Sequence, residues 1–273
     1  MQQVADFIEE CEVLNAVLEP LGPADFERVT LFKDWTVNHV LQHLHFFNMM
    51  ADYSAFQPQR FQDDYGRLRA MMAERGSSMV EPTHEMLEGL SGPALRAAWR
   101  ETYMAMEPRW SAADPKTRVK WAGPDMSMRS SITARQMETW AHAQEIFDLL
   151  GLERPEGDRI RNIAHLGVST YGWTFINRGE AVPEPAPYVR LSAPSGAVWE
   201  WGEPSESERV DGNAVAFCQV VAQTRNIADT GLAVTGPNAT RWMSIAQCFA
   251  GAPNDPPAPG TRVKAANAPG ENP

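Results

Sequence analysis

The stretch that decides the fold is RQMETWAHAQEIFDLLG, residues 135–151, which belongs to a longer amphipathic segment beginning near Met128. The apolar residues of this segment recur at helical spacing and predict a helix that ends at about Leu150. The core-facing stripe consists of Met128, Ile132, Ile146 and Leu150. His142 lies just inside the edge of the stripe, and Glu138 lies about 40° further out. Because these two residues are four positions apart, they project from one face of the helix.

A second informative stretch is WTVNHVLQHLHFF, residues 35–47. Thr36 is a suitable N-cap, and the apolar spacing after it predicts a helix that runs to about Phe56. The stripe of this helix consists of Val37, Val40, Leu44 and Phe47. His43 lies at the margin of the stripe, whereas His45 points nearly the opposite way, so we expect His45 to face solvent.

Taken together, His43, Glu138 and His142 are a candidate ligand set for a metal ion. A glutamate at the margin of an apolar face is costly to bury unless it is paired or ligates a metal. Two imidazoles and one carboxylate, brought together by antiparallel helices, leave a coordination position open, as in catalytic zinc sites. A lone Glu-x-x-x-His pair is a weak signal, and a core histidine satisfied by hydrogen bonds is the competing interpretation of His43. His39, one turn before His43, is an alternative ligand or a residue that orients one.

The rest of the first 180 residues also has helical periodicity. Further helices are expected over residues 3–20, 58–73, 92–107 and 158–178. Four or five helices of this length, joined by short connections, predict an up-and-down four-helix-type bundle over residues 1–180.

The pattern changes after the bundle. The segment EPAPYVRLSAPSGAVWEWG, residues 184–202, alternates around Ser195-Gly196 and predicts a β-hairpin. Asp211 is expected to cap a helix over residues 213–226, and a short strand at residues 232–236 leads to a last helix at about 239–249. These elements predict a small α+β domain over residues 181–252, so the fold class is α+β. The proline-rich tail, residues 253–273, is expected to be disordered or extended over the surface.

The bulk composition excludes several classes of function. The formal net charge is −11, and no lysine or arginine cluster of the kind a nucleic-acid binder needs is present. No apolar run approaches the roughly 20 residues that cross a bilayer. The acidic N-terminal stretch is unlike a signal peptide, and three widely spaced cysteines predict reduced thiols, so we expect a cytoplasmic protein. We expect the protein to be a monomer or a homodimer. Gly-rich phosphate loops and nucleotide fingerprints are absent from the sequence.

Two motifs carry a family resemblance. WTVNHVLQHL and RQMETWAHAQEIFDLLG resemble the motifs of DinB-like metal-binding bundles, most closely the subgroup that includes the mycothiol-dependent maleylpyruvate isomerase. The resemblance implies that His43, Glu138 and His142 coordinate a divalent metal, usually zinc, with water completing the shell. QVVAQTRNIADTGLAVTGPNATRWMSIAQCFAGAP, residues 219–253, is similar, more loosely, to the sterol-carrier-like α+β domain attached to these bundles.

The same resemblance implies thiol chemistry. A zinc-type cation favours the thiolate form of a bound thiol, and the thiolate is the nucleophile. No cysteine lies near the proposed ligands in the sequence, so the sulfur is expected from a diffusible low-molecular-weight thiol such as mycothiol. The leading hypothesis is a metal-dependent thiol transferase or isomerase that acts on a small electrophile. The alternatives are a metal hydrolase, with Glu145 or His39 as proton carrier, and a non-catalytic metal- or ligand-binding protein.

Four further residues are assigned roles by position. Arg225, at the end of the helix expected from Asn213, is the candidate to clamp an anionic group bidentately, or else makes an ordinary ion pair. Arg135 is expected to pair with Glu138 and orient it. Glu145 is the candidate acid–base residue. Trp140 is the candidate cofactor contact, although a tryptophan brings enough area to be an ordinary core residue instead.

Overall fold

The computed structural model describes residues 1–76, 78–121, 123 and 125–265, and it divides into two compact units, Met1–Leu149 and Leu150–Pro273. The first unit holds the helices of the bundle, and the second is a small α+β unit, so the predicted fold class is confirmed. The sequence predicts that residues 158–178 belong to the bundle, but the division falls before them. These residues form α7 (Arg161–Ser169) and α8 (Tyr171–Ile176), which pack against helices of the second unit.

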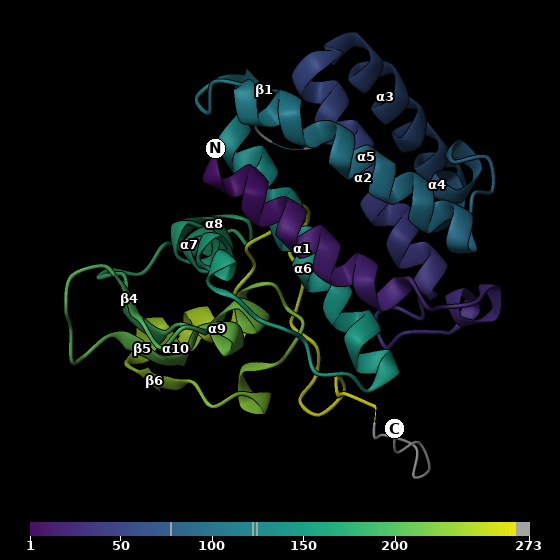
Figure 1. Ribbon diagram of the computed structural model, residues 1–273. Helices are drawn as coiled ribbons and strands as arrows, with labels where there is room; N and C mark the ends of the chain where they lie inside the picture. The colour runs from purple at the N-terminus through teal and green to yellow at the C-terminus, as the bar shows by residue number, and fades with distance from the viewer. Residues whose placement is uncertain (77, 122, 124, 266–273) are drawn as a thin grey trace. The chain divides into compact units, whose positions relative to one another are not determined.

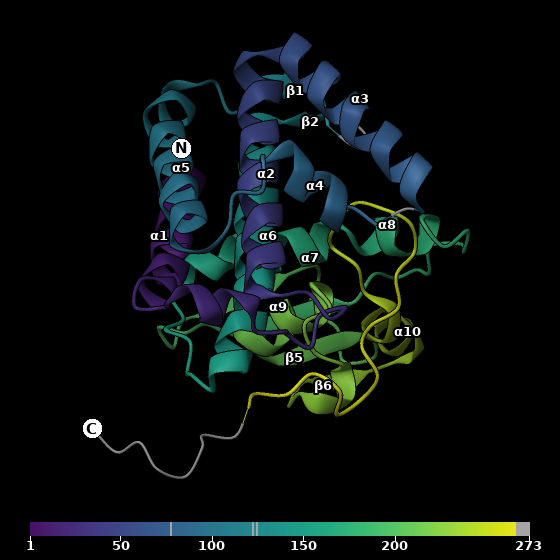
Figure 2. The same cartoon turned by 90° about the vertical axis from the view of Figure 1, so that its right-hand side faces the viewer.

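The first unit is built on four long helices. These are α1 (Gln2–Leu18), α2 (Val37–Phe56), α5 (Gly92–Ala112) and α6 (Met128–Leu150). A short 3-10 turn, η1 (Pro23–Glu27), joins α1 to the loop before α2, and the strands β1 (Arg118–Val119) and β2 (Met126–Ser127) form a two-stranded ribbon before α6. Two more helices, α3 (Pro58–Arg75) and α4 (Val80–Met86), lie on the side of α2 away from α1 and α5 (Figure 1 and Figure 2).

Hydrogen bonds between helices fix their directions. Trp110 Nε1 in α5 donates to Asp52 Oδ1 in α2 at 3.1 Å, and Gly92 N at the start of α5 donates to Asn38 Oδ1 at 2.7 Å. Early residues of α2 therefore meet early residues of α5, so these helices run in the same direction. The crossover between them is made by α3 and α4, so α2 and α5 depart from the predicted up-and-down order, although helical bundles accommodate such a connection.

The second helix, α2, is buried on nearly all sides, because α3 and α4 cover the face that a single stripe would leave open. His45 lies on a different side, midway between Asn38 and Asp52, both of which bond to α5, so it faces α5. It is only 6% exposed, and the prediction that it faces solvent is wrong. His165 on α7, in contrast, is exposed.

The second unit has a four-stranded sheet in the order β4-β3-β5-β6. The strands are β3 (Tyr188–Ser192), β4 (Val198–Trp201), β5 (Arg209–Asn213) and β6 (Ala233–Thr235). The helices α9 (Ala214–Val221) and α10 (Pro237–Ile245) follow β5 and β6. The 3-10 turn η2 (Asp158–Ile160) precedes α7, and the turn η3 (Ile227–Asp229) lies between α9 and β6. The predicted hairpin is confirmed, since β3 and β4 pair antiparallel. Strand β5, which was not predicted, lies parallel to β3 and contains Asp211. The cap of α9 is therefore Asn213, whose Oδ1 accepts from Val215 N at 2.7 Å, and not Asp211.

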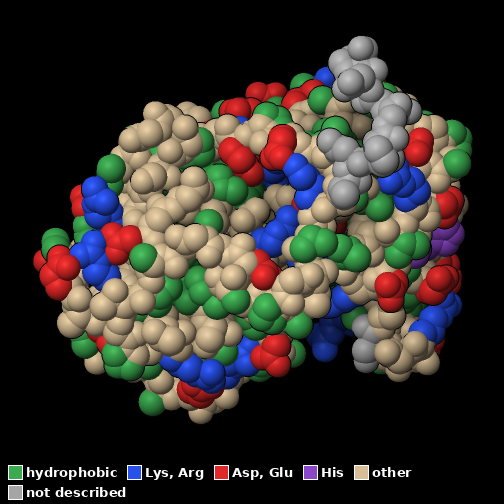
Figure 3. Space-filling model, turned by 90° about the horizontal axis from the view of Figure 1, so that it is seen from below, with side chains coloured by type: hydrophobic (Ala, Val, Ile, Leu, Met, Phe, Trp, Pro, Cys, Tyr) green, Lys and Arg blue, Asp and Glu red, His purple; other side chains and the backbone are tan. Residues whose placement is uncertain are grey.

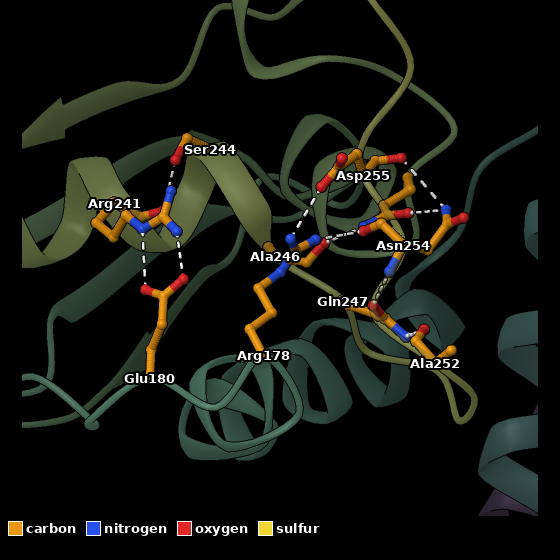
Figure 4. A network of polar contacts seen from close by, with 10 residues as sticks. Arg178, Glu180, Arg241, Ser244, Ala246, Gln247, Ala252, Asn254 and Asp255 are labelled. Carbon is orange, nitrogen blue, oxygen red and sulfur yellow. Dashed lines mark hydrogen bonds and ion pairs between the residues drawn. The ribbon is translucent and has the colours of Figure 1, made fainter.

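The described part of the proline-rich tail is extended and hydrogen-bonded to the second unit. Asn254 N donates to Gln247 Oε1 at 2.9 Å, and Asn254 Nδ2 donates to Gln223 Oε1 at 2.6 Å. Arg178 forms an ion pair with Asp255 at 2.9 Å (Figure 4). Of the two conformations expected for the tail, these contacts show the extended one for the residues near Asn254. Residues 266–273 lie outside the described part of the chain.

The surface carries both signs of charge. On the face drawn in Figure 3, acidic and basic side chains are interspersed. No helix in the described part of the chain is long and apolar enough to cross a membrane.

Candidate metal centre

The antiparallel packing of α2 and α6 places His43 opposite Glu138 and His142. His43 Nε2 lies 3.1 Å from Glu138 Oε2, and His142 Nε2 lies 3.4 Å from the same oxygen. One ligand atom from each of the three residues lies within 4.8 Å of the other two. The side chains predicted as ligands, 95 positions apart in the chain for His43 and Glu138, thus converge on one point.

The geometry of this cluster fits a divalent metal ion. Zinc binds imidazole nitrogen and carboxylate oxygen at roughly 2.0–2.2 Å, which places neighbouring ligand atoms of a tetrahedral site about 3.3 Å apart. Both distances from Glu138 Oε2 are already close to that edge length. Three protein ligands leave a fourth position for an exogenous group.

The protonation states of the cluster also suit ligation. Burial lowers the pKa of His43 to about 4, against the opposing influence of its hydrogen bond to Glu138. Burial alone would raise the pKa of Glu138, but hydrogen bonds from His142 and His43 outweigh it and hold that pKa well below the usual range. Near neutral pH the structure therefore offers a neutral His43 and an ionised Glu138, the forms that bind a metal.

The neighbours of the cluster are fixed by other contacts. Arg135, expected to orient Glu138, is buried, and its Nε donates to Asn48 Oδ1 at 3.0 Å. The guanidinium still acts electrostatically on both Glu138 and His43. The hydrogen bond to Asn48 ties α6 to α2 one to two turns from the cluster and so holds the two ligand-bearing helices in register.

His39, the alternative ligand, has a different role. Thr36 Oγ1 accepts from His39 N at 3.2 Å, and His39 Nδ1 accepts from Thr36 N at 3.2 Å. This reciprocal pair is a capping box that starts α2. His39 therefore fixes where the helix begins, and the group of potential ligands found among the described residues does not include it.

The other predicted site residues lie at separate places. Glu145 and Trp140 are buried in α6, and Trp140 has no exposed surface. Trp140 follows Glu138 by two residues, so it leaves the helix on the opposite side. Arg225 belongs to the second unit, is half-buried, and donates from Nη1 to Thr224 O at 2.8 Å. The roles given to these three residues stay predictions.

Aromatic rings that the sequence did not assign to the site surround the imidazoles. The Trp35 ring lies 5.8 Å from the His142 ring with the planes 5° apart, and Phe32 meets the same imidazole edge-on at 5.1 Å. The Phe47 ring lies 4.8 Å from the His43 ring. Trp35 opens the motif WTVNHVLQHL, and the apolar spacing of α2 assigns Phe47 to the core stripe. Phe32, in the preceding loop, gave no signal at all.

Comparison with known proteins identifies the family of the bundle. The family model described as the mycothiol maleylpyruvate isomerase N-terminal domain matches residues 7–147. Uncharacterised proteins from two strains of Mycobacterium tuberculosis, CDC 1551 / Oshkosh and H37Rv, are each 35% identical over 250 residues, covering 92% of this chain and 96% of theirs.

The fold has counterparts among solved structures. Crystal structures of the mycothiol-dependent maleylpyruvate isomerase and of a mutant of it match with a TM-score of 0.50 and 16% sequence identity, over 81% of this chain and 88% of theirs. At this identity the structures establish a shared fold, and the matched family model establishes kinship for the bundle that holds the cluster. The chain belongs to the mycothiol maleylpyruvate isomerase N-terminal domain family.

Proposed function

We propose that this protein is a metal-dependent enzyme that uses a low-molecular-weight thiol, mycothiol or a similar compound, in isomerisation of, or S-transfer to, a small electrophile. The observation that carries the proposal is the convergence of His43, Glu138 and His142 on one point. Family membership supports the choice of thiol, because the solved relative with this fold is a mycothiol-dependent isomerase.

The source of the sulfur follows from the cysteines of the chain. Cys11 is fully buried in α1, and burial raises the pKa of its thiol well above the ordinary value. Cys218 and Cys248 are buried in the second unit. A buried thiol with a raised pKa is a poor nucleophile. The reactive sulfur is therefore supplied by a diffusible thiol.

Each proposed ligand has a defined task. A divalent ion, most suitably Zn²⁺ for this donor set, would lower the pKa of a coordinated thiol. His43 and His142 would hold the ion through Nε2, and Glu138 would hold it through Oε2 and offset part of its charge. The hydrogen bond between Arg135 and Asn48 keeps the two helices in place while ligands exchange.

The chemistry begins with attack of the thiolate sulfur on an electron-poor carbon–carbon double bond. The new carbon–sulfur bond forms as the π electrons move onto the conjugated carbonyl, leaving a single bond that can rotate. Expulsion of the thiolate then restores the double bond in the other geometry, and the thiol is regenerated. If a leaving group departs with its electron pair instead, the sulfur stays on the product and the outcome is S-transfer.

Three residues are proposed around this reaction. Arg225 would hold an anionic group of the thiol or the electrophile bidentately, as a guanidinium does with a carboxylate. Glu145 would take part in proton transfer, whereas Trp140, fully buried on the opposite side of α6 from Glu138, would support the site through packing and not through the predicted cofactor contact. Replacing Arg225 with glutamine should raise KM for the anionic partner at least about tenfold, on the scale of a lost charge-assisted pair, without lowering the zinc content.

The first test is metal content with a matched control. Purified protein should contain one zinc ion per chain, and His142→Ala should lose it, whereas His165→Ala, which removes an exposed histidine, should keep it. A protein that binds no divalent metal under any loading condition would refute the proposal.

The second test separates the possible chemistries. With zinc loaded, turnover of an activated alkene should require added thiol and should stop in His142→Ala. Hydrolysis without thiol would indicate a metal hydrolase, and zinc without turnover under any thiol would indicate a non-catalytic binding protein. Either result contradicts the proposed function.

A further inference from the structure

The proposed ligands reach solvent, so a substrate can approach them. The side chain of Glu138 is 26% exposed, and those of His43 and His142 are 12% and 11% exposed. A molecule that approaches this cluster meets the side chains that flank the imidazoles. The chemistry of those side chains therefore limits which molecules the site accepts.

The flanking side chains are aromatic. Phe32 and Trp35 contact each other edge-on at 5.0 Å, and both rings pack on the His142 imidazole. Trp35 also lies 5.6 Å from His43, so its indole borders both proposed nitrogen ligands. Both residues are only partly buried, which leaves ring surface available. We call Phe32 and Trp35 the aromatic wall.

The loop that carries the aromatic wall is held in an unusual conformation. Lys33 and Asp34, between the two wall residues, have φ of 51° and 57°. A left-handed backbone costs a residue other than glycine roughly 1–2 kcal/mol. The surrounding structure holds it there through hydrogen bonds across the loop, with Thr30 N and Oγ1 both donating to Trp35 O at 2.8 Å. The rings of the wall are thus preorganised.

The same loop exposes further apolar surface. Val29 and Leu31 are 52% and 54% exposed, although each is within three residues of Phe32. Apolar side chains gathered on one loop beside a polar cluster are typical of a ligand-binding surface.

Two cations of the described residues, Arg135 and Lys33, make other contacts near the cluster. Arg135, the cation that acts on His43, is buried and bonded to Asn48. Lys33 Nζ lies over the Phe32 ring at 5.1 Å. The rings that border the imidazoles therefore favour an apolar group over an anionic one directly beside the reacting carbon.

We propose that the electrophile carries a flat apolar group, an aryl or extended conjugated system, next to its reacting carbon, and that this group packs on Trp35 and Phe32. This inference rests on the proposed function, because it names the substrate class of the same site. In the reaction, the thiolate sulfur bonds to the β-carbon of the activated alkene, the π electrons move to the carbonyl oxygen, and solvent protonates the resulting enolate. The aromatic wall takes no part in bond making; it positions the substrate.

The test begins with binding, using ketones that cannot react. Benzylacetone and methyl propyl ketone share the methyl ketone and differ in the aryl group. Zinc-loaded, thiol-free protein should bind benzylacetone at least about tenfold more tightly in ligand-observed NMR titrations, as expected for a stacked ring. Equal affinities would overturn the inference.

Variants then test whether Trp35 and Phe32 cause the tighter binding of the aryl ketone. Trp35→Leu and Phe32→Leu should each reduce the ratio of the two affinities about fivefold or more, whereas Trp35→Phe should keep most of it. Tyr65→Leu removes a partly buried ring of the same unit that stacks on Phe61 and should leave the ratio unchanged. Each variant is checked for zinc content. If Trp35→Leu does not fold or loses zinc, Phe32→Leu decides the outcome.

Turnover separates this inference from the proposed function. With thiol present, benzylideneacetone should react with a kcat/KM at least about tenfold above that of ethylideneacetone. Turnover of both enones at similar rates, with no aryl preference in binding, would overturn the inference and leave the thiol chemistry standing. An aryl preference in binding without thiol-dependent turnover would refute the proposed function and leave the aromatic wall as a binding surface.

Discussion

Glu138 is the residue on which both imidazoles of the cluster converge. Its Oε2 accepts from His43 and His142, and these bonds overcome the burial that would otherwise favour the protonated acid. Without an ion, the carboxylate holds the two imidazoles together through these hydrogen bonds, and the same three atoms would be the ligands of a bound ion. The position therefore serves both the packing of α2 on α6 and the proposed chemistry.

Glu138→Gln tests the chemical part of this assignment. The amide keeps the shape of the side chain but removes its negative charge and makes a poor zinc ligand, so zinc affinity should fall by more than about a hundredfold, beyond the usual effect of a residue that only orients a ligand. Competition with a zinc chelator measures it. Glu101→Gln, an exposed acid on α5, is the matched control and should bind zinc as the native protein does. Equal affinities in all three proteins would show that Glu138 is not a ligand.

His45 should make the protein sensitive to acid. It is buried, and burial lowers its pKa to about 4, below the roughly 6.5 of an exposed imidazole. Between these values the unfolded chain binds the proton and the folded chain does not. The free energy of unfolding is therefore not lowered by His45 above pH 6.5, and it falls as the pH drops from 6.5 toward 4.

His45→Leu removes this dependence. Relative to the native protein, the variant should gain up to about 3 kcal/mol in free energy of unfolding between pH 6.5 and pH 4, the value set by the pKa difference. Urea unfolding followed across that range measures the gain. The other histidines are common to both proteins, so two parallel stability profiles would mean that His45 is not the titrating group.

At the scale of elements, the long helices, the β3–β4 hairpin and the short strand β6 were predictable, and strand β5 between them was not. The periodicity of α6 and the N-cap Thr36 gave both ligand-bearing helices nearly to the residue. Strand β5, with the sequence RVDGN, has neither alternation nor β-branched runs, and its parallel partner β3 lies in a separate segment. Its strand character comes from tertiary pairing, which a local pattern cannot show.

In the candidate site, too, the residues on helices were predictable and the residues on a loop were not. The positions of Glu138 and His142 follow from helical geometry, which four-residue spacing encodes directly. Phe32 and Trp35 depend on a loop with two left-handed residues, Lys33 and Asp34, neither of which is glycine. Nothing in the sequence of that loop indicates its course, so the aromatic wall was visible only in the structure.

The close packing of α7 on α9 gives a prediction for Gly167. A Cβ at this position would lie 2.7 Å from Val221 Cγ2 and 3.0 Å from Phe217 Cε1. Gly167→Ala should therefore destabilise the protein by about 1–3 kcal/mol in denaturant unfolding, because overpacking outweighs the gain in helix propensity. Gly172→Ala in α8 is the control: its Cβ would meet nothing closer than 3.9 Å, so it should be neutral or slightly stabilising. Equal effects of the two substitutions would contradict the packing argument.

For the molecule as a whole, the tail completes the second unit. Asn254 bonds to Gln223 through its side chain, and Gln223 is buried, so a polar group inside the unit depends on a residue of the tail. Arg178 also donates toward this segment through its ion pair with Asp255 (Figure 4). The tail is thus part of the folded structure as far as these contacts extend.

Asn254→Ala should release the tail. Loss of the side-chain bond leaves Gln223 Oε1 without this donor, at a cost of about 1–3 kcal/mol. Hydrogen exchange of the amides between residues 254 and 264 should speed up while that of α2 and α6 stays unchanged. Thr261→Val, which removes a bond made within the tail to Ala258 O, is the control and should have a smaller effect. Unchanged exchange in Asn254→Ala would mean that the tail is held by its other contacts.

The wide separation of the proposed ligands along the chain has a thermodynamic consequence. An ion bound by His43 and Glu138 would act as a reversible cross-link that closes a loop of 95 residues. Closing such a loop removes chain entropy on the order of 4 kcal/mol. Zinc would then stabilise the folded bundle as well as serve as a catalytic cofactor. The melting temperature of the bundle would rise with the fraction of sites that hold zinc.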